Sequence, residues 1–337
     1  MNASASSRHV RPAPNVAIIG AGMAGISCAR ALHERGWRVR VFDKARGVGG
    51  RMSTRRLTPW HFDHGAPAFE AQDPLFRQAL GRWAREGFVR PWHARLAKVD
   101  AEGDIQEAED ENLWVGIPRM SALVRSLASG LEIEYEQRIT ALVRQQEQWY
   151  LDTAEGERRG PYDIVVSAIP AEQAEALLRG TSELAERVAT QSLVPCFALL
   201  LGYEGSLDLE WDGVKYQAHP LLSRAYRNSA KPLRPAEEAW VLYANAAWSA
   251  EHEESNPERL GPLLLESFAA SLRLQLPTPA YLSLHRWRFS QATQALGPSC
   301  LFDYEQNLGV CGDWCLGSGV ESAFLSGSAM AQQLVSD

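Results

Sequence analysis

Lysine is scarce in this sequence of 337 residues, and clustered positive charge is absent. The chain holds 34 lysines and arginines against 41 acidic residues, a net charge of −7, and its basic residues form no run. Nucleic acids and anionic membranes attract proteins through clustered Lys and Arg. The composition therefore argues against both partners and favours a small molecule. The four lysines are Lys44, Lys98, Lys215 and Lys231.

Cysteine and long apolar runs are scarce as well. Five scattered cysteines make no disulfide framework, and no Cys/His group has zinc-site spacing, so we expect reduced thiols and no metal. Residues 1–15 are rich in Ser, Ala and Pro without an apolar core, and no run reaches the ~18 apolar residues of a membrane span. We expect a cytoplasmic protein with a flexible arm at 1–14.

The apolar residues, 45% of the chain, suffice for a large core. At roughly 150 residues per domain, the length predicts two domains or one large fold with an insertion. The sequence makes no prediction about oligomeric state.

Near the N-terminus the sequence predicts a strand, a glycine turn, a helix and a second strand. The apolar run 16–19 meets Gly-x-Gly-x-x-Gly at 20–25, a helical pattern follows at 26–35, and the alternating residues 37–42 end at Asp43. A glycine motif alone also fits a structural turn, but the strand, helix and acid around it are typical of a dinucleotide-binding βαβ unit.

Each residue of this motif has a separate expected task. Gly20 permits the tight turn, Gly22 lets a pyrophosphate approach the backbone, and Gly25 lets the helix pack closely on the strand. The phosphates are expected at the helix N-terminus, where free N–H groups and the helix dipole favour negative charge. Asp43 is expected to accept hydrogen bonds from an adenosine ribose.

A second glycine-rich loop follows directly at residues 44–54. Its glycines let the chain pass close to a large ligand, while Arg46 and Arg51 are suited to hold a phosphate or a nearby carboxylate. The alternative is a solvated charged loop. The small-residue turn at 63–69 suits backbone lying along a flat ring system.

The remaining chain predicts two interleaved domains. Strand patterns at 131–135, 139–143, 149–153 and 162–169 are expected to complete the nucleotide sheet, and a last strand-turn-helix carries Gly312-Asp313. The expected nucleotide-binding domain comprises 15–72, 116–170 and 285–337, and the expected substrate domain comprises 73–115 and 171–284.

The Gly20-x-Gly22-x-x-Gly25 motif, the Arg46 to Arg51 loop and Gly312-Asp313 together resemble the flavin amine oxidase superfamily. Within it the chain is more similar to bacterial renalases, on short segments spread along almost the whole chain: 42–53, 115–122, 225–232, 285–287 and 311–316. The resemblance implies an α/β fold with a Rossmann-type FAD-binding domain and a discontinuous α+β substrate domain, in a para-hydroxybenzoate-hydroxylase-like architecture. It also implies noncovalent FAD and oxidation of 2- or 6-dihydro-NAD(P) isomers, with O2 reduced to H2O2.

The expected cofactor-binding residues lie in the glycine turns and loops described above, with a few neighbours. They are Gly20, Gly22, Met23, Ala24, Gly25, Asp43, Lys44, Arg46, Gly49, Gly50, Arg51, Met52, Gly65, Ala66, Ile139, Gly312, Asp313, Val320 and Glu321.

The chain departs from the renalase pattern where the substrate is expected to stack. Renalases tend to carry Gln-Tyr where this chain has Pro67-Ala68, and Leu-His-Ala where it has Tyr243 between Leu and Ala. The candidates for the ring pocket are Phe69, Tyr243, Asn245 and Trp248. No residue is assigned as a catalytic acid or base, and His285 and Trp287 are expected to be structural.

Two other functions stay open. A flavin amine or polyamine oxidase ranks second, because such enzymes usually position a lysine near flavin N5 and lysines are few here. A flavin-holding or nucleotide-sensing protein without turnover is the third hypothesis. The expected partners are a small-molecule substrate, either a dihydronicotinamide dinucleotide or an amine, and O2.

Overall fold

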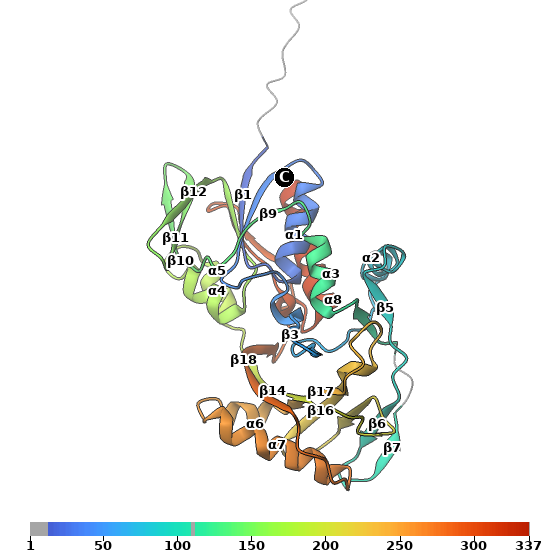
Figure 1. The fold of residues 1–337 in the computed structure, drawn as a ribbon. Coiled ribbons are helices and arrows are strands. Elements are labelled where there is room, and N and C mark those ends of the chain that lie inside the picture. The colour runs from blue at the N-terminus through green and yellow to red at the C-terminus, as the bar shows by residue number, and fades with distance from the viewer. Residues whose placement is uncertain (1–12, 109–111, 337) are drawn as a thin grey trace, which may run out of the picture.

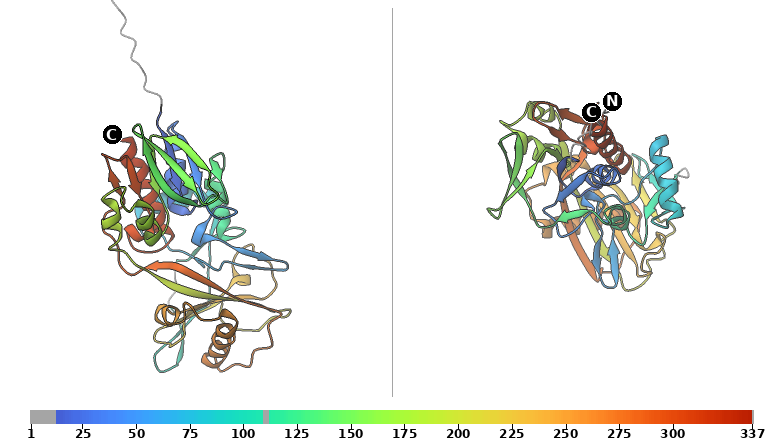
Figure 2. Two further views of the ribbon diagram at one scale, coloured as in Figure 1. Left: turned by 90° about the vertical axis from the view of Figure 1, so that its left-hand side faces the viewer. Right: turned by 90° about the horizontal axis from the view of Figure 1, so that it is seen from above.

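A computed structural model describes residues 13–108 and 112–336 of the chain, which fold into two lobes (Figure 1). One lobe is built on a six-stranded sheet and the other on a seven-stranded sheet. The expected flexible arm at 1–14 lies, except for its last two residues, outside the described residues. Strand β18 runs between the lobes, as the side view in Figure 2 also shows.

The six-stranded sheet contains the predicted βαβ unit. Its strand order is β19-β20-β13-β1-β2-β9, and all neighbours are parallel except β19 and β20. The helix α1, Met23–His33, connects β1 to β2. The strands are β1 Asn15–Ile19, β2 Arg38–Phe42, β9 Glu132–Glu134, β13 Ile164–Ser167, β19 Leu301–Asp303 and β20 Leu308–Val310.

Alternate side chains of β1 pack into the cores on the two faces of this sheet. Val16 and Ile18 belong to a core shared with helices α1, α3 (Met120–Leu127) and α8 (Val320–Val335). Ala17 and Ile19 point the other way, since successive side chains of a strand alternate. Their core includes α4 (Ala171–Leu178), α5 (Leu184–Val188) and a small antiparallel sheet.

That small sheet corrects one prediction. Strands β10 (Ile139–Gln145), β11 (Gln148–Thr153) and β12 (Arg158–Tyr162) pair only with one another among the described residues and do not extend the nucleotide sheet. Their buried side chains, Leu142, Trp149 and Leu151, cover one face of it instead.

The seven-stranded sheet has the order β18-β14-β17-β16-β15-β6-β7. Helices α6 (Ala246–Glu251) and α7 (Pro257–Ser271) pack on its outer face (Figure 1). Its other face, which includes Ala198, Leu200 and Tyr243, joins the core of the first lobe. The strands are β6 Leu96–Val99, β7 Ile105–Glu107, β14 Leu193–Gly202, β15 Gly213–Tyr216, β16 Leu222–Arg227, β17 Ala239–Ala244 and β18 Tyr281–Ala292.

The expected domain boundaries differ from this architecture in three places. The boundary at 284/285 falls inside β18, which pairs with β14 along most of its length. Helices α4 and α5 pack on the six-stranded sheet, although 171–284 was expected to form the substrate domain. Helix α2 (Pro74–Arg85) contacts α8 through Phe76 and Phe324, so it also lies against the first lobe.

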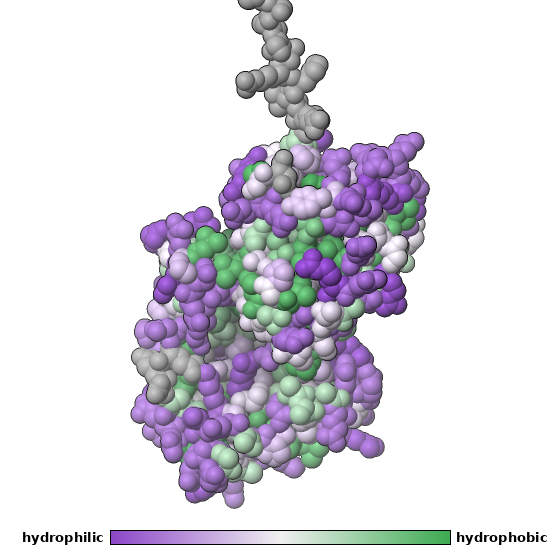
Figure 3. Space-filling view, turned by 180° about the vertical axis from the view of Figure 1, so that it is seen from behind, coloured by the Kyte–Doolittle hydropathy of each residue, from purple (hydrophilic) through white to green (hydrophobic). Residues whose placement is uncertain are grey.

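The remaining elements connect the lobes. They are the strand pairs β3 (Arg55–Leu57) with β4 (Trp60–Phe62) and β5 (Val89–Pro91) with β8 (Trp114–Gly116), and the 3-10 helices η1 (Gly50–Met52), η2 (Asn228–Ala230) and η3 (Asp313–Cys315). Seen from behind, the surface is hollowed between the lobes, and apolar residues gather above the hollow (Figure 3).

Candidate flavin and substrate site

A cavity of about 1190 Å³ lies at the carboxyl ends of β1, β2 and β13 and reaches the facing side of the seven-stranded sheet. Ligands of open α/β sheets bind at this end of the strands. Pockets for ordinary small ligands are about 300–1,000 Å³, so the volume suits a dinucleotide together with a second molecule.

Two helices begin at this cavity without a side-chain cap. Gly22 precedes α1 and Gly319 precedes α8, and neither N-terminus is capped by a side-chain hydrogen bond. Both glycines line the cavity, and a Cβ built on either one meets no atom within 4 Å. The free N–H groups of the first turns therefore remain available to an anion, which the helix dipoles also favour.

The other two glycines of the turn, Gly20 and Gly25, leave no room for a side chain. A Cβ on Gly25 would overlap the carbonyl oxygen of Gly20, so the helix lies directly against the turn. Gly20 has a φ of +111°, a conformation that side chains disfavour, and its N–H donates to Phe42 O at 2.7 Å. The turn is thereby held against the end of β2.

Asp43 is fixed at this junction. Its carboxylate accepts hydrogen bonds from the N–H of Ala21 at 2.6 Å and of Ala45 at 2.7 Å. These contacts hold the side chain at the edge of the cavity next to the glycine turn. The carboxylate keeps further lone pairs for a ligand hydroxyl.

The two arginines of the glycine-rich loop differ. Arg51 lines the cavity and binds Asp313 through two hydrogen bonds of 2.6 and 2.8 Å, and it also donates to Ser290 O at 3.0 Å. Arg51 was expected to hold a phosphate or a nearby carboxylate, and in the structure it binds a carboxylate, that of Asp313. Arg46 is outside the cavity lining; its side chain is 92% exposed and lies 3.5 Å from Glu136.

The structure therefore brings together all the expected cofactor-binding residues except Gly25 and Arg46. Gly25 packs behind the turn, and Arg46 points to solvent.

At the other end of the cavity, aromatic side chains and an arginine form the walls. Phe69 and Tyr243 line it as expected, and His285, Trp287 and Arg224 do so as well. The Tyr243 hydroxyl donates to Asp63 O at 2.8 Å, and burial raises its pKa well above the usual value. Burial, with a smaller contribution from Arg55, lowers the pKa of His285 to about 4, so this imidazole is neutral at pH 7.

Two of the substrate candidates lie away from the cavity. The Asn245 side chain accepts a hydrogen bond from Trp248 N at 2.8 Å and caps α6. Trp248 packs against Phe197 in the core between the sheet and α7. Neither residue lines the cavity.

His285 and Trp287, in contrast, were expected to be structural and lie on the cavity wall. Trp287 donates through Nε1 to His64 O at 2.8 Å, and the His64 and His285 rings lie edge to face at 4.7 Å. The sequence did contain a signal for this placement. His285 and Trp287 are two residues apart, so in a strand their side chains lie on the same face.

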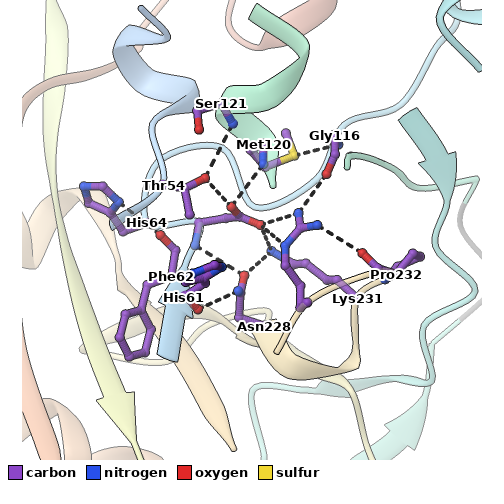
Figure 4. A network of polar contacts seen from close by, with 12 residues as sticks. Thr54, His61, Phe62, His64, Gly116, Met120, Ser121, Asn228, Lys231 and Pro232 are labelled. Atoms are coloured by element: carbon purple, nitrogen blue, oxygen red, sulfur yellow. Dashed lines mark hydrogen bonds and ion pairs between the residues drawn. The ribbon is translucent and has the colours of Figure 1, made fainter. Parts of the chain in front are cut away.

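Below the aromatic wall, a buried ionic network joins the lobes (Figure 4). The fully buried carboxylate of Asp63 accepts from Lys231 Nζ at 3.2 Å, Arg234 Nη2 at 2.7 Å and Thr54 Oγ1 at 2.6 Å. Lys231 also donates to Asn228 Oδ1 at 2.8 Å.

The pKa shifts in this network follow from burial and charge. Burial alone would raise the pKa of Asp63, but Lys231 and Arg234 hold it well below its usual value. Burial lowers the pKa of Lys231 to about 8, although Asp63 opposes that shift. Lys231 is thus committed to Asp63 and does not line the cavity.

The comparison with protein families decides the assignment. Residues 72–335 match the model of the flavin containing amine oxidoreductase family, and residues 18–83 match the NAD(P)-binding Rossmann-like domain. The chain belongs to the flavin-containing amine oxidoreductase family. FAD is therefore its cofactor.

Two solved structures with the same fold match nearly the whole of this chain. A putative protoporphyrinogen oxidase from Exiguobacterium sp. 255-15 superposes with a TM-score of 0.78 over 95% of this chain and 98% of its own, at 12% identity. A redesigned putrescine oxidase gives a TM-score of 0.72 over 96% and 99%, also at 12% identity. At this identity the likeness shows the fold.

Curated relatives match over shorter segments. The L-amino-acid oxidase of Siganus canaliculatus is 34% identical over 71 residues, 20% of this chain, and that of Crotalus adamanteus is 30% identical over 112 residues, 33% of this chain. The chain spans only 14% and 19% of their lengths.

The residues present fit FAD on two observations. The two uncapped helix N-termini face one cavity, as described above. In addition, Gln137 Oε1, Glu172 Oε2 and Arg224 Nε are buried without a hydrogen-bond partner, and all three residues line that cavity. Buried polar atoms are normally paired, so these atoms indicate polar ligands.

No described helix is long and apolar enough to span a membrane, and the described residues hold no candidate metal cluster.

Proposed function

We propose that this flavoprotein is a renalase-like oxidase that converts 2- or 6-dihydro-NAD(P) isomers to NAD(P)+. The balanced reaction is dihydro-NAD(P) plus O2 and one proton giving NAD(P)+ and H2O2. The para-hydroxybenzoate-hydroxylase-like arrangement of the two lobes is part of this proposal. FAD bound by these residues would supply the redox chemistry, a two-electron oxidation of the substrate coupled to reduction of O2.

One observation carries the proposal: the substrate end of the cavity is aromatic and has no lysine among its described residues. Lys44 is the one lysine in the lining, and it lies beside Asp43 at the nucleotide end. Oxidation of a dihydropyridine restores an aromatic ring without a general base, so such a substrate needs orientation more than proton transfer. Phe69, Tyr243 and Trp287 would sandwich its flat ring.

The remaining residues have assigned parts in this proposal. The first turns of α1 and α8 would bind the FAD pyrophosphate and an electron-rich oxygen of the flavin. Asp43 would bind the adenosine ribose. The Arg51–Asp313 pair would fix the loop and the C-terminal turn around the flavin, and neutral His285 would exclude charge and water from the ring pocket.

Oxidation of an amine or amino acid is the second candidate. The L-amino-acid oxidases and the putrescine oxidase among the similar proteins favour it. A protein without turnover is the third candidate. All three hypotheses predict bound FAD and differ in what reduces it.

Anaerobic mixing separates these functions. Holoenzyme is mixed with 2-, 4- and 6-dihydronicotinamide dinucleotides, polyamines and L-amino acids, and flavin absorbance near 450 nm is followed. We expect the 2- and 6-dihydro isomers to bleach the flavin far faster than the others, with H2O2 released on admission of air. Reduction by amines or amino acids alone would overturn the proposal, and reduction by none would favour the protein without turnover.

A further inference from the structure

Arg224 stands apart from the other arginines of the substrate region. Arg51, Arg286 and Arg288 also line the cavity, and each lies within 4 Å of a carboxylate. Arg138 lines the nucleotide end, next to Gln137, whose N–H donates to Asp43 O. Among the described residues Arg224 has no such partner: no ion pair or hydrogen bond of its guanidinium is found, and Nε is buried and unsatisfied. The residue as a whole is partly buried. A buried donor without an acceptor is costly, and that cost falls when an anion binds.

The orientation of Arg224 leaves its donors available. It lies on β16 opposite Tyr243 on β17, with the guanidinium carbon 5.1 Å from the centre of the Tyr243 ring. Stacking on a ring engages the face of the guanidinium and leaves the N–H groups at its edge free. Tyr243 is itself fixed by its hydrogen bond to Asp63 O, so Arg224 has a rigid support.

A second cavity meets the first at this arginine. It measures about 300 Å³, and Cys196, Arg224 and Gln291 line both cavities. Lys215, which pairs with Arg224 across β15 and β16, also lines this side chamber, as does Ser223. The chamber thus combines cationic and hydroxyl groups next to the aromatic wall.

We propose that Arg224 is a specificity-determining residue that binds an anionic group of the substrate, with the side chamber accepting that group. The proposal rests on the proposed function in one respect, that the substrate occupies the aromatic end of the cavity. A guanidinium binds planar carboxylates and phosphates through paired hydrogen bonds, so either group fits. The anion would anchor the substrate while its reacting ring or carbon lies between the aromatic walls.

The test compares matched pairs of ligands that differ by one anionic group. For phosphate, oxidised nicotinamide mononucleotide is compared with nicotinamide riboside, and for carboxylate, L-phenylalanine is compared with phenethylamine. Dissociation constants come from titrations of oxidised holoenzyme, read from the flavin spectrum. Rates of anaerobic flavin reduction are measured with the dihydro forms of the first pair and with both members of the second.

We expect wild-type protein to bind the anionic member of one pair at least tenfold more tightly than its neutral or cationic counterpart. Arg224→Gln should remove this preference, with a tenfold or larger rise in the dissociation constant of the anionic member and a change below twofold for the other. Arg224→Lys should restore part of it. The pair that responds identifies phosphate or carboxylate. Arg90→Gln, which removes an exposed arginine of β5 outside the cavity, is the control for net charge.

An equal weakening of both members by Arg224→Gln would indicate a structural role and overturn the proposal, as would no change in either. These titrations do not depend on turnover. Failure of all candidates to reduce the flavin would refute the proposed oxidase while leaving the Arg224 result readable. Equally rapid reduction of the flavin by the dihydro forms of the riboside and the mononucleotide would support the oxidase and refute the anion site.

Discussion

Replacement of Asp63 by Asn tests the buried network most directly. The carboxylate accepts hydrogen bonds from Thr54, Lys231, Arg234 and Met120 N–H and donates none. An amide of the same shape removes the negative charge and turns two N–H donors toward these donors. Breaking a buried ion pair by removing one partner costs about 3–5 kcal/mol, because the other charge stays buried and uncompensated. We expect Asp63→Asn to destabilise the protein by that amount.

The pKa of Lys231 predicts which substitution in the network destabilises the protein more. Its fall from 10.5 to about 8 means that burial disfavours the ammonium by about 3 kcal/mol even with Asp63 present. Lys231→Met removes this unfavourable charge and leaves Asp63 bound by Arg234. It should therefore cost less than Asp63→Asn, and the double variant should be more stable than Asp63→Asn alone.

The assay is guanidinium denaturation followed by tryptophan fluorescence, with far-UV circular dichroism as a second probe. Glu175→Gln is the matched control, since it breaks an exposed pair with Arg179, and it should change stability by less than about 0.5 kcal/mol. Coincidence of the two probes is required before midpoints are converted to free energies. A loss below about 1 kcal/mol for Asp63→Asn, or a larger loss for Lys231→Met, would refute the reasoning.

Three further outcomes follow from the cavity and its walls. Gly22→Val should abolish flavin binding while the apoprotein folds normally, because a Cβ there meets no protein atom within 4 Å. Gly25→Val should instead lower the yield of folded protein, because its Cβ would overlap Gly20 O. Flavin content and circular dichroism distinguish the two. Asp43→Ala should weaken FAD binding at least tenfold while the apoprotein keeps its helical signal, and an unchanged dissociation constant in flavin fluorescence titration would speak against the ribose contact. Burial lowers the pKa of both His64 and His285 to about 4, against 6.5 when unfolded, so the unfolded state binds protons first as pH falls. The stability linked to these residues is therefore present above pH 6.5 and is lost between pH 6.5 and 4, up to about 3 kcal/mol for His64; denaturation midpoints at pH 7, 5.5 and 4 should fall less steeply for His64→Gln than for the wild type.

Local pattern was sufficient to predict the elements around the nucleotide. The alternation in 37–42 and the glycine spacing at 20–25 predicted β2 and the β1–α1 turn. These features depend on residues that are close together in the sequence, so the sequence alone is enough to predict them. The partners of strands do not: β10, β11 and β12 have ordinary strand patterns, and nothing local indicates that they pair apart from the nucleotide sheet.

The placement of Asn245 away from the cavity has a similar cause. Tyr243 and Asn245 are two residues apart and would share a face if the strand that carries Tyr243 continued through Asn245. The strand ends at Ala244, and Asn245 turns to cap α6, so its side chain leaves that face. Arg224 has no sequence signature at all, because its place on the cavity depends on the register of β16 against β17.

The packing of α1 against α8 bears on how the protein is made. The two helices touch so closely that a Cβ on Gly327 would overlap the backbone of Ala24. At about 5–20 residues per second, a ribosome takes on the order of 15–60 seconds to reach α8 after it has finished α1. During that interval the side of α1 that packs on α8 has no cover, and the anion site formed by the helix N-termini at Gly22 and Gly319 is incomplete. Cofactor capture is therefore a late event in biosynthesis, and the nascent chain would profit from a chaperone that shields its first helix.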